Sequence, residues 1–516
     1  MNIGYLLTFM AGKVPNKTAV VCGDVRLSYK KLNSRANRLA HSLLGMNIKK
    51  GDKVALLSVN SIYYPEIFFG ILKAGGVLAT VNFRLAPEEI LYILDNSDAR
   101  IFIFEKELAS SVAAIRSRLI KVEKFICVGE DPYEHAQDYE QLIAKQLDTE
   151  PEVHISLEDD CEIIHTSGTT GRPKGVMLTH GNVLYTMLSV IIGRELRPGQ
   201  TSLVVSPMYH VAGLNNHFGT TIMLGGTAVI IRRFEPQAIM QTIQREKVAY
   251  FPAASTIFNM LVQAIEGKKY DTSSVMQLQS GSEITPVEVR KKLAQYFPNA
   301  LGVYEAYGLT EVGDGVVFLT GRDSLERPAS VGKAGLFAQL RVVDDNGQDV
   351  DVGEVGEIII KGPVVMKGYY KNKEETEEAI RNGWLYTGDL GRLDAEGCLY
   401  IVGRKKDMII SGGENIYPRE IEEVLWRHPK IADVVIIGVP DKQWGEAIRA
   451  VVELRPGEKM TEEEVIEFCK QHIASYKKPK SVVFVKELPR NPSGKVLKNE
   501  VRARCGQTTP SREENN

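Results

Sequence analysis

The sequence predicts an α/β protein: a large N-terminal domain of layered α/β sheets with a β-rich subdomain, then a small, mobile α+β C-terminal domain. Apolar, β-branched runs alternate with segments of helical period from residue 17 to about residue 250. From residue 330 to 400 the pattern changes to short strands separated by glycine. Because 516 residues exceed the size at which one hydrophobic core keeps growing, we expect more than one domain.

The first elements show the α/β alternation. A helix with one apolar face precedes the strand-like run Lys53–Leu57. The apolar face comprises Tyr29, Leu32, Ala36, Leu39, Ala40 and Leu43. Further along the chain, strands and helices alternate over residues 202–206, 211–224, 227–231, 235–246 and 248–251. This order is typical of a parallel sheet.

A compact α+β pattern follows residue 407. Helices are predicted over residues 419–427 and 462–473, and strands over residues 434–439 and 482–485. We therefore predict an N-terminal domain over residues 1–403 and a C-terminal domain over 408–505, joined by residues 404–407. Residues 506–516 are polar, and we expect them to be disordered.

The charge balance argues against nucleic acid as the main partner. Lys and Arg total 63 against 65 Asp and Glu, so there is no basic excess. No apolar run approaches the roughly 20 residues that a membrane helix needs, and residues 1–17 lack the features of a signal peptide. We expect a cytoplasmic protein with no integral membrane segment and with small-molecule partners; a homodimer is one option for its assembly.

The cysteines and histidines give no sign of a metal centre or a hydrolase. The six cysteines are scattered and form no C-x-x-C pair. The nine histidines form no H-E-x-x-H motif, and the sequence contains no G-x-S-x-G. We therefore expect reduced cysteines and no hydrolytic site.

Residues 166–175 form the first strong chemical signal. The segment reads TSGTTGRPKG and follows a strand-like run. Its hydroxyls, backbone N–H groups and lysine can surround a polyphosphate, and its glycines allow close approach of the backbone. It is not a Walker A loop, and the alternative is a flexible surface loop. The predicted phosphate-binding residues are Thr166, Ser167, Gly168, Thr169, Thr170, Gly171 and Lys174.

Five motifs resemble those of the adenylate-forming superfamily, which contains acyl-CoA synthetases, peptide-synthetase adenylation domains and luciferases. They are residues 166–175, 307–311 (YGLTE), 386–389 (YTGD), 403–407 (GRKKD) and 492–495 (PSGK). The motifs occur in the family's order, and the resemblance covers essentially the whole chain. The resemblance implies that a carboxylic acid reacts with ATP to give acyl-AMP and pyrophosphate, and that coenzyme A then takes the acyl group.

This chemistry needs fixed positive charge, because a carboxylate must approach a triphosphate and pyrophosphate must leave. Lys495, Lys174 and Mg²⁺ can supply that charge. In the family, the lysine that matches Lys495 contacts both the carboxylate and the α-phosphate. The resemblance assigns the magnesium to Glu311 and Thr166, with phosphate oxygens and water completing its shell.

The resemblance also implies how the nucleoside is held. An acidic residue that matches Asp389 accepts hydrogen bonds from the ribose hydroxyls, and an arginine that matches Arg404 reaches the ribose or phosphate. Without the resemblance, these two would be a turn residue and a surface residue. The remaining residues that match the adenosine site are Gly281, Ser282, Glu283, Tyr307, Gly308 and Thr310.

His210 matches a family histidine near the substrate carboxylate and the entrance of the acyl pocket. A lone histidine beside an apolar helix would otherwise be read as a core residue. The pocket walls are expected from residues 210–215, 251–255, 280–281 and 305–313. Aryl, alicyclic, medium-chain and dicarboxylic acids all remain open as substrates.

Thioester formation needs a second arrangement of the site, because the thiol must reach the adenylate from the side that Lys495 covers. In the family the C-terminal domain rotates about a hinge, which corresponds here to Lys406. The resemblance then assigns coenzyme A contacts to Gly412, Gly413, Trp444 and Lys478. Lys478 belongs to a basic run that would otherwise be read as solvated surface.

Two further observations limit the assignment. Ile410 stands where plant coumarate ligases and luciferases often have lysine, and residues 408–416 look more like bacterial benzoate, chlorobenzoate and medium-chain acid ligases. The alternatives are a stand-alone adenylation enzyme that loads a carrier protein and a non-catalytic binding homologue. The joint presence of Lys495, Glu311, Asp389 and Arg404 argues against the second.

Overall fold

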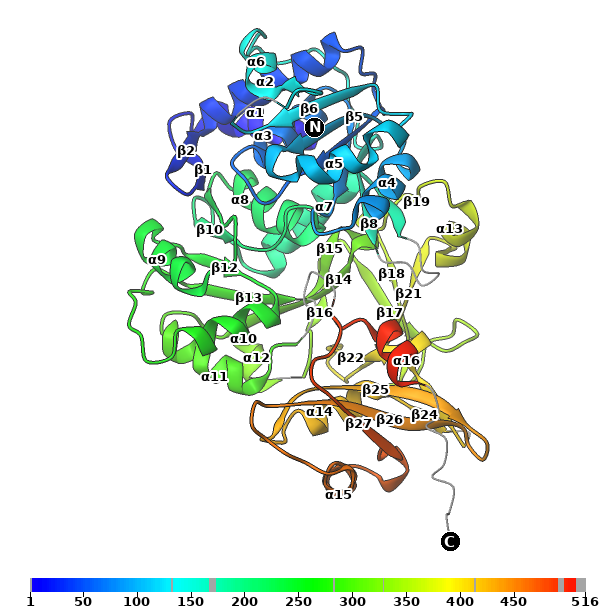
Figure 1. Cartoon of the computed structure of the whole chain (residues 1–516). Helices are drawn as coiled ribbons and strands as arrows, with labels where there is room; N and C mark the ends of the chain where they lie inside the picture. The colour runs from blue at the N-terminus through cyan, green and yellow to red at the C-terminus, as the bar shows by residue number, and fades with distance from the viewer. Residues whose placement is uncertain are drawn as a thin grey trace. The chain divides into compact units, whose positions relative to one another are not determined.

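The computed structural model describes residues 2–130, 133–166, 173–281, 284–327, 329–412, 414–490 and 496–506 (Figure 1). The chain divides into two compact units. Unit 1 comprises Met1–Leu340 and Ile360–Tyr386, and unit 2 comprises Arg341–Ile359 and Thr387–Asn516. The chain therefore passes from one unit to the other more than once.

The first sheet of unit 1 has the order β16-β15-β14-β13-β12-β10-β11-β1-β2 in the described residues. Its strands are β1 (Thr18–Cys22), β2 (Val25–Ser28), β10 (Thr201–Val204), β11 (Thr227–Ile230), β12 (Tyr250–Pro252), β13 (Gln277–Gly281), β14 (Val303–Leu309), β15 (Asp314–Leu319) and β16 (Lys333–Ala334). The successive strands from β14 to β1 in this order pair in parallel. Strands β2, β15 and β16 pair antiparallel with their neighbours. The carboxyl ends of β13 and β14 consequently lie at one edge, a usual place for ligands in such sheets.

The second sheet of unit 1 has the order β19-β9-β8-β4-β3-β5-β6-β7. Its strands are β3 (Lys53–Leu57), β4 (Val77–Val81), β5 (Ala99–Glu105), β6 (Lys124–Val128), β7 (Gln137–Asp138), β8 (Asp160–Thr166), β9 (Lys174–Thr179) and β19 (Gly368–Tyr369). Every residue of β4 is buried, which is typical of a parallel strand covered on both faces. Strands β8 and β9 form an antiparallel hairpin, and β19 adds to the outside of β9.

Helices cover these two sheets. They are α1 (Ile3–Lys13), α2 (Tyr29–Gly45), α3 (Tyr64–Lys73), α4 (Pro87–Asn96), α5 (Ala109–Ile115), α6 (Tyr139–Ala144), α7 (His180–Gly193), α8 (Thr220–Met223), α9 (Pro236–Glu246), α10 (Ser255–Ala264), α11 (Val287–Tyr296), α12 (Asp323–Glu326) and α13 (Lys373–Ala379). Short 3₁₀ helices are η1 (Lys106–Leu108), η2 (Arg116–Arg118) and η4 (Thr310–Val312), and η3 (Ala212–Gly219) is a π-helix. Aromatic packing fixes the helices around β12: the ring of Phe251 lies 5.1 Å from that of Phe258 and 6.0 Å from that of Phe297.

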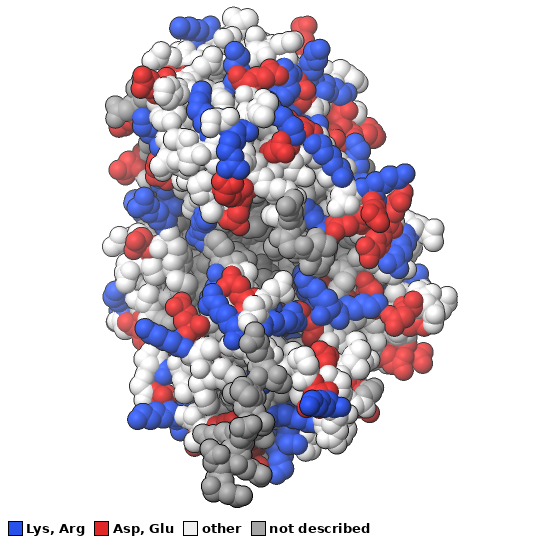
Figure 2. Space-filling model, turned by 45° about the vertical axis from the view of Figure 1, so that its right-hand side comes forward, with Lys and Arg blue, Asp and Glu red and all other residues white. Residues whose placement is uncertain are grey.

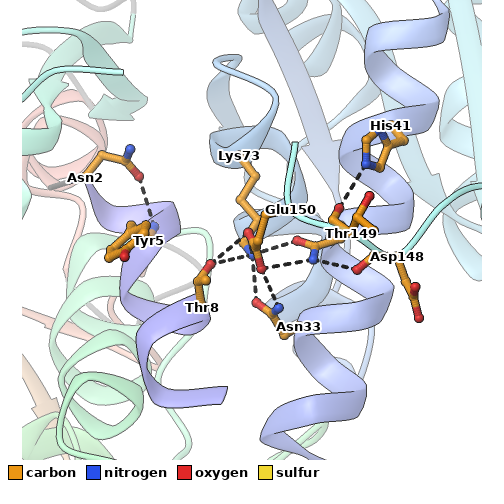
Figure 3. Close-up of polar contacts among 10 residues, drawn as sticks. Asn2, Tyr5, Thr8, Asn33, His41, Lys73, Asp148, Thr149 and Glu150 are labelled. Carbon is orange, nitrogen blue, oxygen red and sulfur yellow. Dashed lines mark hydrogen bonds and ion pairs between the residues drawn. The ribbon is translucent and has the colours of Figure 1, made fainter. Parts of the chain in front are cut away.

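A buried lysine joins three helices near the N-terminus (Figure 3). The ammonium group of Lys73 donates to Thr8 at 2.8 Å, to Asn33 and Asn37 at 2.7 Å, and to Glu150 at 2.7 Å. A buried ammonium group is costly unless it is paired, so these contacts satisfy it. The network ties α1 and α2 to the C-terminal end of α3.

A third sheet has the order β17-β18-β21-β20, and β22 pairs with β21. Its strands are β17 (Gln339–Val343), β18 (Gly356–Lys361), β20 (Ile380–Arg381), β21 (Trp384–Leu393) and β22 (Leu399–Arg404). The unit boundaries fall within β17, β18 and β21. This is the β-rich segment that the glycine-punctuated sequence predicts.

The last sheet, in unit 2, has the order β24-β23-β26-β25, with β27 paired to β26. Its strands are β23 (Ile409–Ser411), β24 (Glu414–Ile416), β25 (Ile431–Asp441), β26 (Gly445–Leu454) and β27 (Ser481–Val485). The helices are α14 (Pro418–Leu425), α15 (Glu462–His472), α16 (Lys498–Cys505), η5 (Lys405–Asp407) and η6 (Ser475–Lys477). Successive residues of β25 face opposite cores: Ile436 packs in the one that contains α14 and α15, and Ile437 in the one that contains Val501 of α16.

The α/β fold class is confirmed, and β3 has the predicted bounds. Several other elements differ from the predictions in their bounds, and two of these differences have a clear physical reason. The segment predicted as one helix over residues 211–224 is the π-helix η3 followed by the short α8, and the hydroxyls of Thr220 and Thr221 bond to the carbonyls of Asn216 and His217. The strand predicted over residues 434–439 extends to Ile431–Asp441, because β26 pairs along its length.

The surface carries charges of both signs. Lys and Arg side chains are interspersed with Asp and Glu over the described residues of the face in Figure 2. The formal net charge of the chain is −2. No helix in the described ranges combines the length and the apolar composition that crossing a membrane requires.

Candidate functional site: the nucleotide and acyl residues

The β8–β9 hairpin positions the ends of the predicted phosphate loop. Thr166, the last residue of β8, lies opposite Lys174, the first residue of β9. The two therefore stand at the mouth of the loop that joins these strands. The other predicted loop residues, Ser167, Gly168, Thr169, Thr170 and Gly171, lie outside the described residues.

Lys174 is held by an acidic and an aromatic partner. Its ammonium nitrogen lies 2.6 Å from Oε2 of Glu375 and 5.1 Å from the ring centroid of Tyr369. Tyr369 reaches this position because β19 pairs with β9, with Tyr369 opposite Val176. A polyphosphate bound here would exchange the Glu375 carboxylate for its own oxygens as the partner of the ammonium group.

Glu311 lies beside the same tyrosine. The hydroxyl of Tyr369 donates to Oε1 of Glu311 at 2.9 Å, and the N–H of Met366 donates to the Glu311 carbonyl at 2.8 Å. Burial raises the pKa of the Tyr369 hydroxyl, and the Glu311 charge raises it further. The phenol thus stays protonated and serves as a donor. The structure thus brings Lys174 and Glu311, far apart in the sequence, into contact with one tyrosine: Lys174 faces its ring and Glu311 accepts from its hydroxyl.

The predicted adenine residues lie at the carboxyl ends of β13 and β14. Gly281 ends β13 and lies opposite Ala306, one residue before Tyr307. A side chain at Gly308 would overlap the carbonyl oxygen of Asp314, so only glycine fits there. Thr310 follows as the first residue of η4. Ser282 and Glu283 lie outside the described residues.

His210 is a neutral group in this structure. The His210 ring lies 4.6 Å from that of Tyr209, and the backbone N–H of His210 donates to the carbonyl of Pro207 at 3.2 Å. Burial lowers the pKa of His210 to about 4, and the nearby Arg84 lowers it as well. The imidazole can orient a carboxylate by hydrogen bonding, but it provides no positive charge near neutral pH.

Unit 2 places Asp389 and Arg404 opposite one another on β21 and β22. Nε of Arg404 lies 3.1 Å from the carboxylate of Asp389, which is buried, whereas the arginine is half-exposed. Gly388 has a φ of +70°, a conformation that favours glycine, and the Asp389 N–H donates to the Thr387 hydroxyl at 3.1 Å. This local conformation within β21 and the ion pair with Arg404 hold the carboxylate that we predict to bind ribose.

Lys406 occupies the middle of η5, directly after β22. Its neighbours are anchored: Lys405 pairs with Glu357 at 3.0 Å, and Asp407 pairs with Arg502 at 2.7 Å. Burial lowers the pKa of Lys406, and the positive charge of Arg404 lowers it further. A rotation of the backbone at Lys406 would therefore take place between two neighbours, Lys405 and Asp407, that are held by ion pairs.

The predicted coenzyme A residues Gly412 and Trp444 are in contact. The Gly412 N–H donates to the Trp444 carbonyl at 2.9 Å, and a Cβ at Gly412 would lie 2.7 Å from the indole. Trp444 is 42% exposed, so its ring is accessible for packing against a ligand. The ammonium group of Lys478 donates to the carbonyl of Ser475 at 3.1 Å. Gly413 and Lys495 lie outside the described residues.

Three neighbours of these residues were not predicted. Tyr369 and Glu375 contact Lys174, and Lys480 lies 4.2 Å from the ring of Trp444. Lys480 could have been found in the basic run 477–480. Tyr369 and Glu375 carry no local signal, since strand pairing between distant segments brings them to the site.

The metal site cannot be an all-protein cage in the described part of the chain. No group of three or more His, Cys, Asp and Glu residues is arranged there to hold a metal ion. Among the described residues, we predict that Glu311 and Thr166 provide the protein's oxygen ligands. One carboxylate with substrate phosphates and water is the usual arrangement for Mg²⁺, so the residues present fit that ion.

Comparisons with known proteins agree with the motifs and the fold. The family model for AMP-binding enzymes matches residues 8–370, and the model for the C-terminal domain of AMP-binding enzymes matches residues 420–495. The chain is 36% identical over 493 residues to feruloyl-CoA synthase of Amycolatopsis sp, covering 95% of this chain and 96% of that protein. It is 36% identical over 518 residues to the long-chain-fatty-acid–CoA ligase FadD13 of Mycobacterium tuberculosis, covering 99% of each.

A solved structure shows the same similarity. The anthranilate CoA ligase AuaEII, in complex with anthranoyl-AMP, superposes with a TM-score of 0.90 at 27% identity. The match covers 98% of this chain and 97% of that one. The chain therefore belongs to the AMP-binding enzymes and is an adenylate-forming acyl-CoA ligase.

Proposed function

We propose that the described residues divide the ligase reaction between a phosphate site, a ribose site and a coenzyme A site. In the first half-reaction, a carboxylate oxygen of the acid attacks the α-phosphorus of ATP, and the bond from that phosphorus to pyrophosphate breaks. In the second half-reaction, the thiol of coenzyme A loses its proton, and its sulfur attacks the acyl carbon. The bond from that carbon to AMP then breaks, which gives acyl-CoA and AMP.

The arrangement of Lys174, Tyr369 and Glu311 carries the proposal for the phosphate site. Lys174, now paired with Glu375, would face the β- and γ-phosphates of bound ATP, and Thr166 lies across the hairpin from it. Glu311 and Thr166 would hold Mg²⁺, which supplies charge neutralisation for the departing pyrophosphate. Tyr369 orients the Glu311 carboxylate through its 2.9 Å hydrogen bond.

We assign the ribose hydroxyls to Asp389 and Arg404, because a buried carboxylate beside a guanidinium can accept two hydrogen bonds from a diol. Gly281, Tyr307 and Gly308 would enclose the adenine. Lys495 would bring the carboxylate to the α-phosphate. Its position in the PSGK motif supports this role.

We assign coenzyme A to the surface around Trp444. The exposed indole offers a face for packing, and Lys480, 4.2 Å from the ring, brings positive charge for phosphate groups. Lys478, two residues before Lys480 in the basic run, would add to this charge. Gly412 keeps the backbone clear of side chains beside the ring. Lys406 is the proposed pivot between the two half-reactions.

The function can be tested by separating the half-reactions. The purified chain should release pyrophosphate from ATP only when an acid and Mg²⁺ are present, and acyl-CoA should appear only when coenzyme A is added. A panel of aryl, alicyclic, medium-chain and dicarboxylic acids, read by mass spectrometry, would identify the acid. Transfer to a carrier-protein thiol in preference to coenzyme A would contradict the proposal, and so would nucleotide binding without pyrophosphate release for any acid.

A further inference from the structure

The lysine that we assign to the phosphates of ATP is already paired with a carboxylate of the chain itself. The ammonium nitrogen of Lys174 lies 2.6 Å from Oε2 of Glu375, and the two side chains are 16% and 19% exposed. Water and salt screen such a pair less than an ion pair on the open surface. Oε2 of Glu375 is buried and accepts no hydrogen bond of ordinary geometry within the described residues, so ionic contact with Lys174 offsets its charge.

Helix α13, which lies beside β19 in Figure 1, holds Glu375 in this position. The side chain of Asn372, directly before the helix, accepts the Glu375 N–H at 3.1 Å. The Thr376 hydroxyl donates to the Asn372 carbonyl at 2.7 Å and accepts the Tyr369 N–H of β19 at 2.9 Å. Strand β19 in turn pairs with β9, which begins with Lys174. Hydrogen-bonded elements therefore bring the two charges together, and the ion pair is a feature of the fold.

Two carboxylates lie near the Tyr369 phenol. Glu311 accepts its hydrogen bond at 2.9 Å. Burial raises the pKa of the phenol most, and the charges of Glu311 and Glu375 both add to this rise. Mg²⁺ would neutralise Glu311, which we assign to the metal. When a polyphosphate takes Lys174, however, Glu375 loses its partner and faces a polyanion, which opposes binding.

We propose that Glu375 competes with polyphosphates for Lys174, and that this competition weakens the binding of ATP and speeds the release of pyrophosphate. As pyrophosphate leaves, the carboxylate returns to the ammonium group, so the partly buried lysine is paired again. Glu375 acts through Lys174, and no covalent bond changes in the exchange. This assignment rests on the proposed function, since it requires that Lys174 binds the β- and γ-phosphates.

The test measures the Kd of the full chain for Mg²⁺–pyrophosphate, for Mg²⁺–ATP without acid, and for AMP, each by isothermal titration calorimetry. Glu375→Gln keeps the shape of the side chain and removes its charge. We expect the Kd for pyrophosphate and for ATP to fall by about fivefold or more, because exposed ion pairs already contribute up to about that factor. The Kd for AMP, which has no β- or γ-phosphate, should not change. The inhibition constant of pyrophosphate during turnover should fall with its Kd.

A matched control separates this effect from a general change of charge. Glu378→Gln removes an exposed carboxylate from the same helix and should leave every Kd unchanged. Equal tightening in both variants would overturn the proposal. Thermal melting checks that the variants fold, and Glu375→Ala, for which we expect the same tightening, decides the question if Glu375→Gln does not fold.

A double variant tests competition directly. In the Lys174→Ala background, Glu375→Gln should no longer tighten the binding of pyrophosphate, because there is no ammonium group to compete for. Tightening that persists would mean that Glu375 only repels the polyanion, and the proposal would be wrong. Weaker binding of Mg²⁺–pyrophosphate by Glu375→Gln alone would place Glu375 among the metal ligands and would also overturn it.

The same measurements distinguish this proposal from the proposed function. If Lys174→Ala binds pyrophosphate and ATP as tightly as the wild type, the assignment of Lys174 to the phosphates fails. If Lys174→Ala weakens both but Glu375→Gln tightens neither, the phosphate site stands and the role of Glu375 is refuted.

Discussion

The phenol of Tyr369 donates a 2.9 Å hydrogen bond to Glu311, and the same ring faces the ammonium group of Lys174 at 5.1 Å. One residue of the short strand β19 thus contacts both groups that we assign to the triphosphate and its metal. The hydrogen bond to Glu311 depends on the Tyr369 hydroxyl alone, so a substitution that removes only this hydroxyl measures its contribution.

Tyr369→Phe should lower kcat/KM for ATP by about tenfold and raise the Mg²⁺ concentration needed for half-maximal rate. A hydrogen bond to a charged group contributes about 1.5 to 3 kcal/mol, and the substitution keeps the ring beside Lys174. Acid-dependent exchange of pyrophosphate into ATP measures the effect. The control is Tyr370→Phe, which removes a 2.8 Å bond to Asp98. Equal losses in both variants would show that Tyr369 has no special role.

Asp389→Ala should raise the KM for ATP by about tenfold to a hundredfold, because the ribose loses charge-assisted hydrogen bonds and Arg404 loses its partner. The KM for coenzyme A should change little. Steady-state kinetics with each substrate varied measures both values. Asp345→Ala is the control, since Asp345 is exposed and pairs with Lys405. An unchanged ATP dependence would remove Asp389 from the ribose site.

Lys406→Pro should leave the first half-reaction largely intact and strongly slow the second. Proline fixes φ near −65° at the proposed pivot, while its neighbours Lys405 and Asp407 stay anchored. Pyrophosphate exchange measures adenylation, and acyl-CoA formation measures transfer. Lys406→Ala, which loses the ammonium group but keeps backbone freedom, should retain both. If both half-reactions fall together in the proline variant, the pivot lies elsewhere.

Glu162→Gln should stabilise the protein at alkaline pH but not at acidic pH. Burial raises the pKa of Glu162 from 4.5 to about 7, while a 3.1 Å bond from Asn215 opposes the rise. The folded state therefore binds this proton more tightly than the unfolded state, and the carboxylate costs stability as the pH rises from 4.5 to 7. Above pH 7 the cost is constant, on the order of 3 kcal/mol, and glutamine removes it.

The difference in melting temperature between Glu162→Gln and the wild type should thus grow from pH 5 to pH 8. Glu158→Gln, at an exposed position, should show no such change. A difference that is the same at both pH values would mean that Glu162 does not titrate in this range.

The sequence predicts individual elements well where the pattern is local. The run Lys53–Leu57 is apolar after its first residue and forms β3 with the predicted bounds. Strand pairings between distant segments carry no such signal: β4 pairs with β8, and β19 pairs with β9. The register of these pairs depends on packing that only the folded chain provides.

The candidate site shows the same difference between local motifs, which the sequence reveals, and contacts between distant segments, which it does not. Glu311, Lys174 and Asp389 were predicted because they belong to motifs, whereas Tyr369 and Glu375 reach Lys174 only through the β19–β9 pairing. The π-helix η3 could not be predicted, since its apolar spacing also fits an α-helix.

The most direct test of the account concerns Lys495, to which we assign only the first half-reaction. Removing its charge should take away about 3 to 4 kcal/mol of transition-state stabilisation, so Lys495→Ala should nearly abolish acid-dependent pyrophosphate release. Acetylation of Lys495, which also removes the charge, should have the same effect. The deciding measurement supplies the folded variant with preformed acyl-AMP and coenzyme A. We predict acyl-CoA formation at close to the wild-type rate, and loss of this transfer step would contradict the division of the reaction into two states.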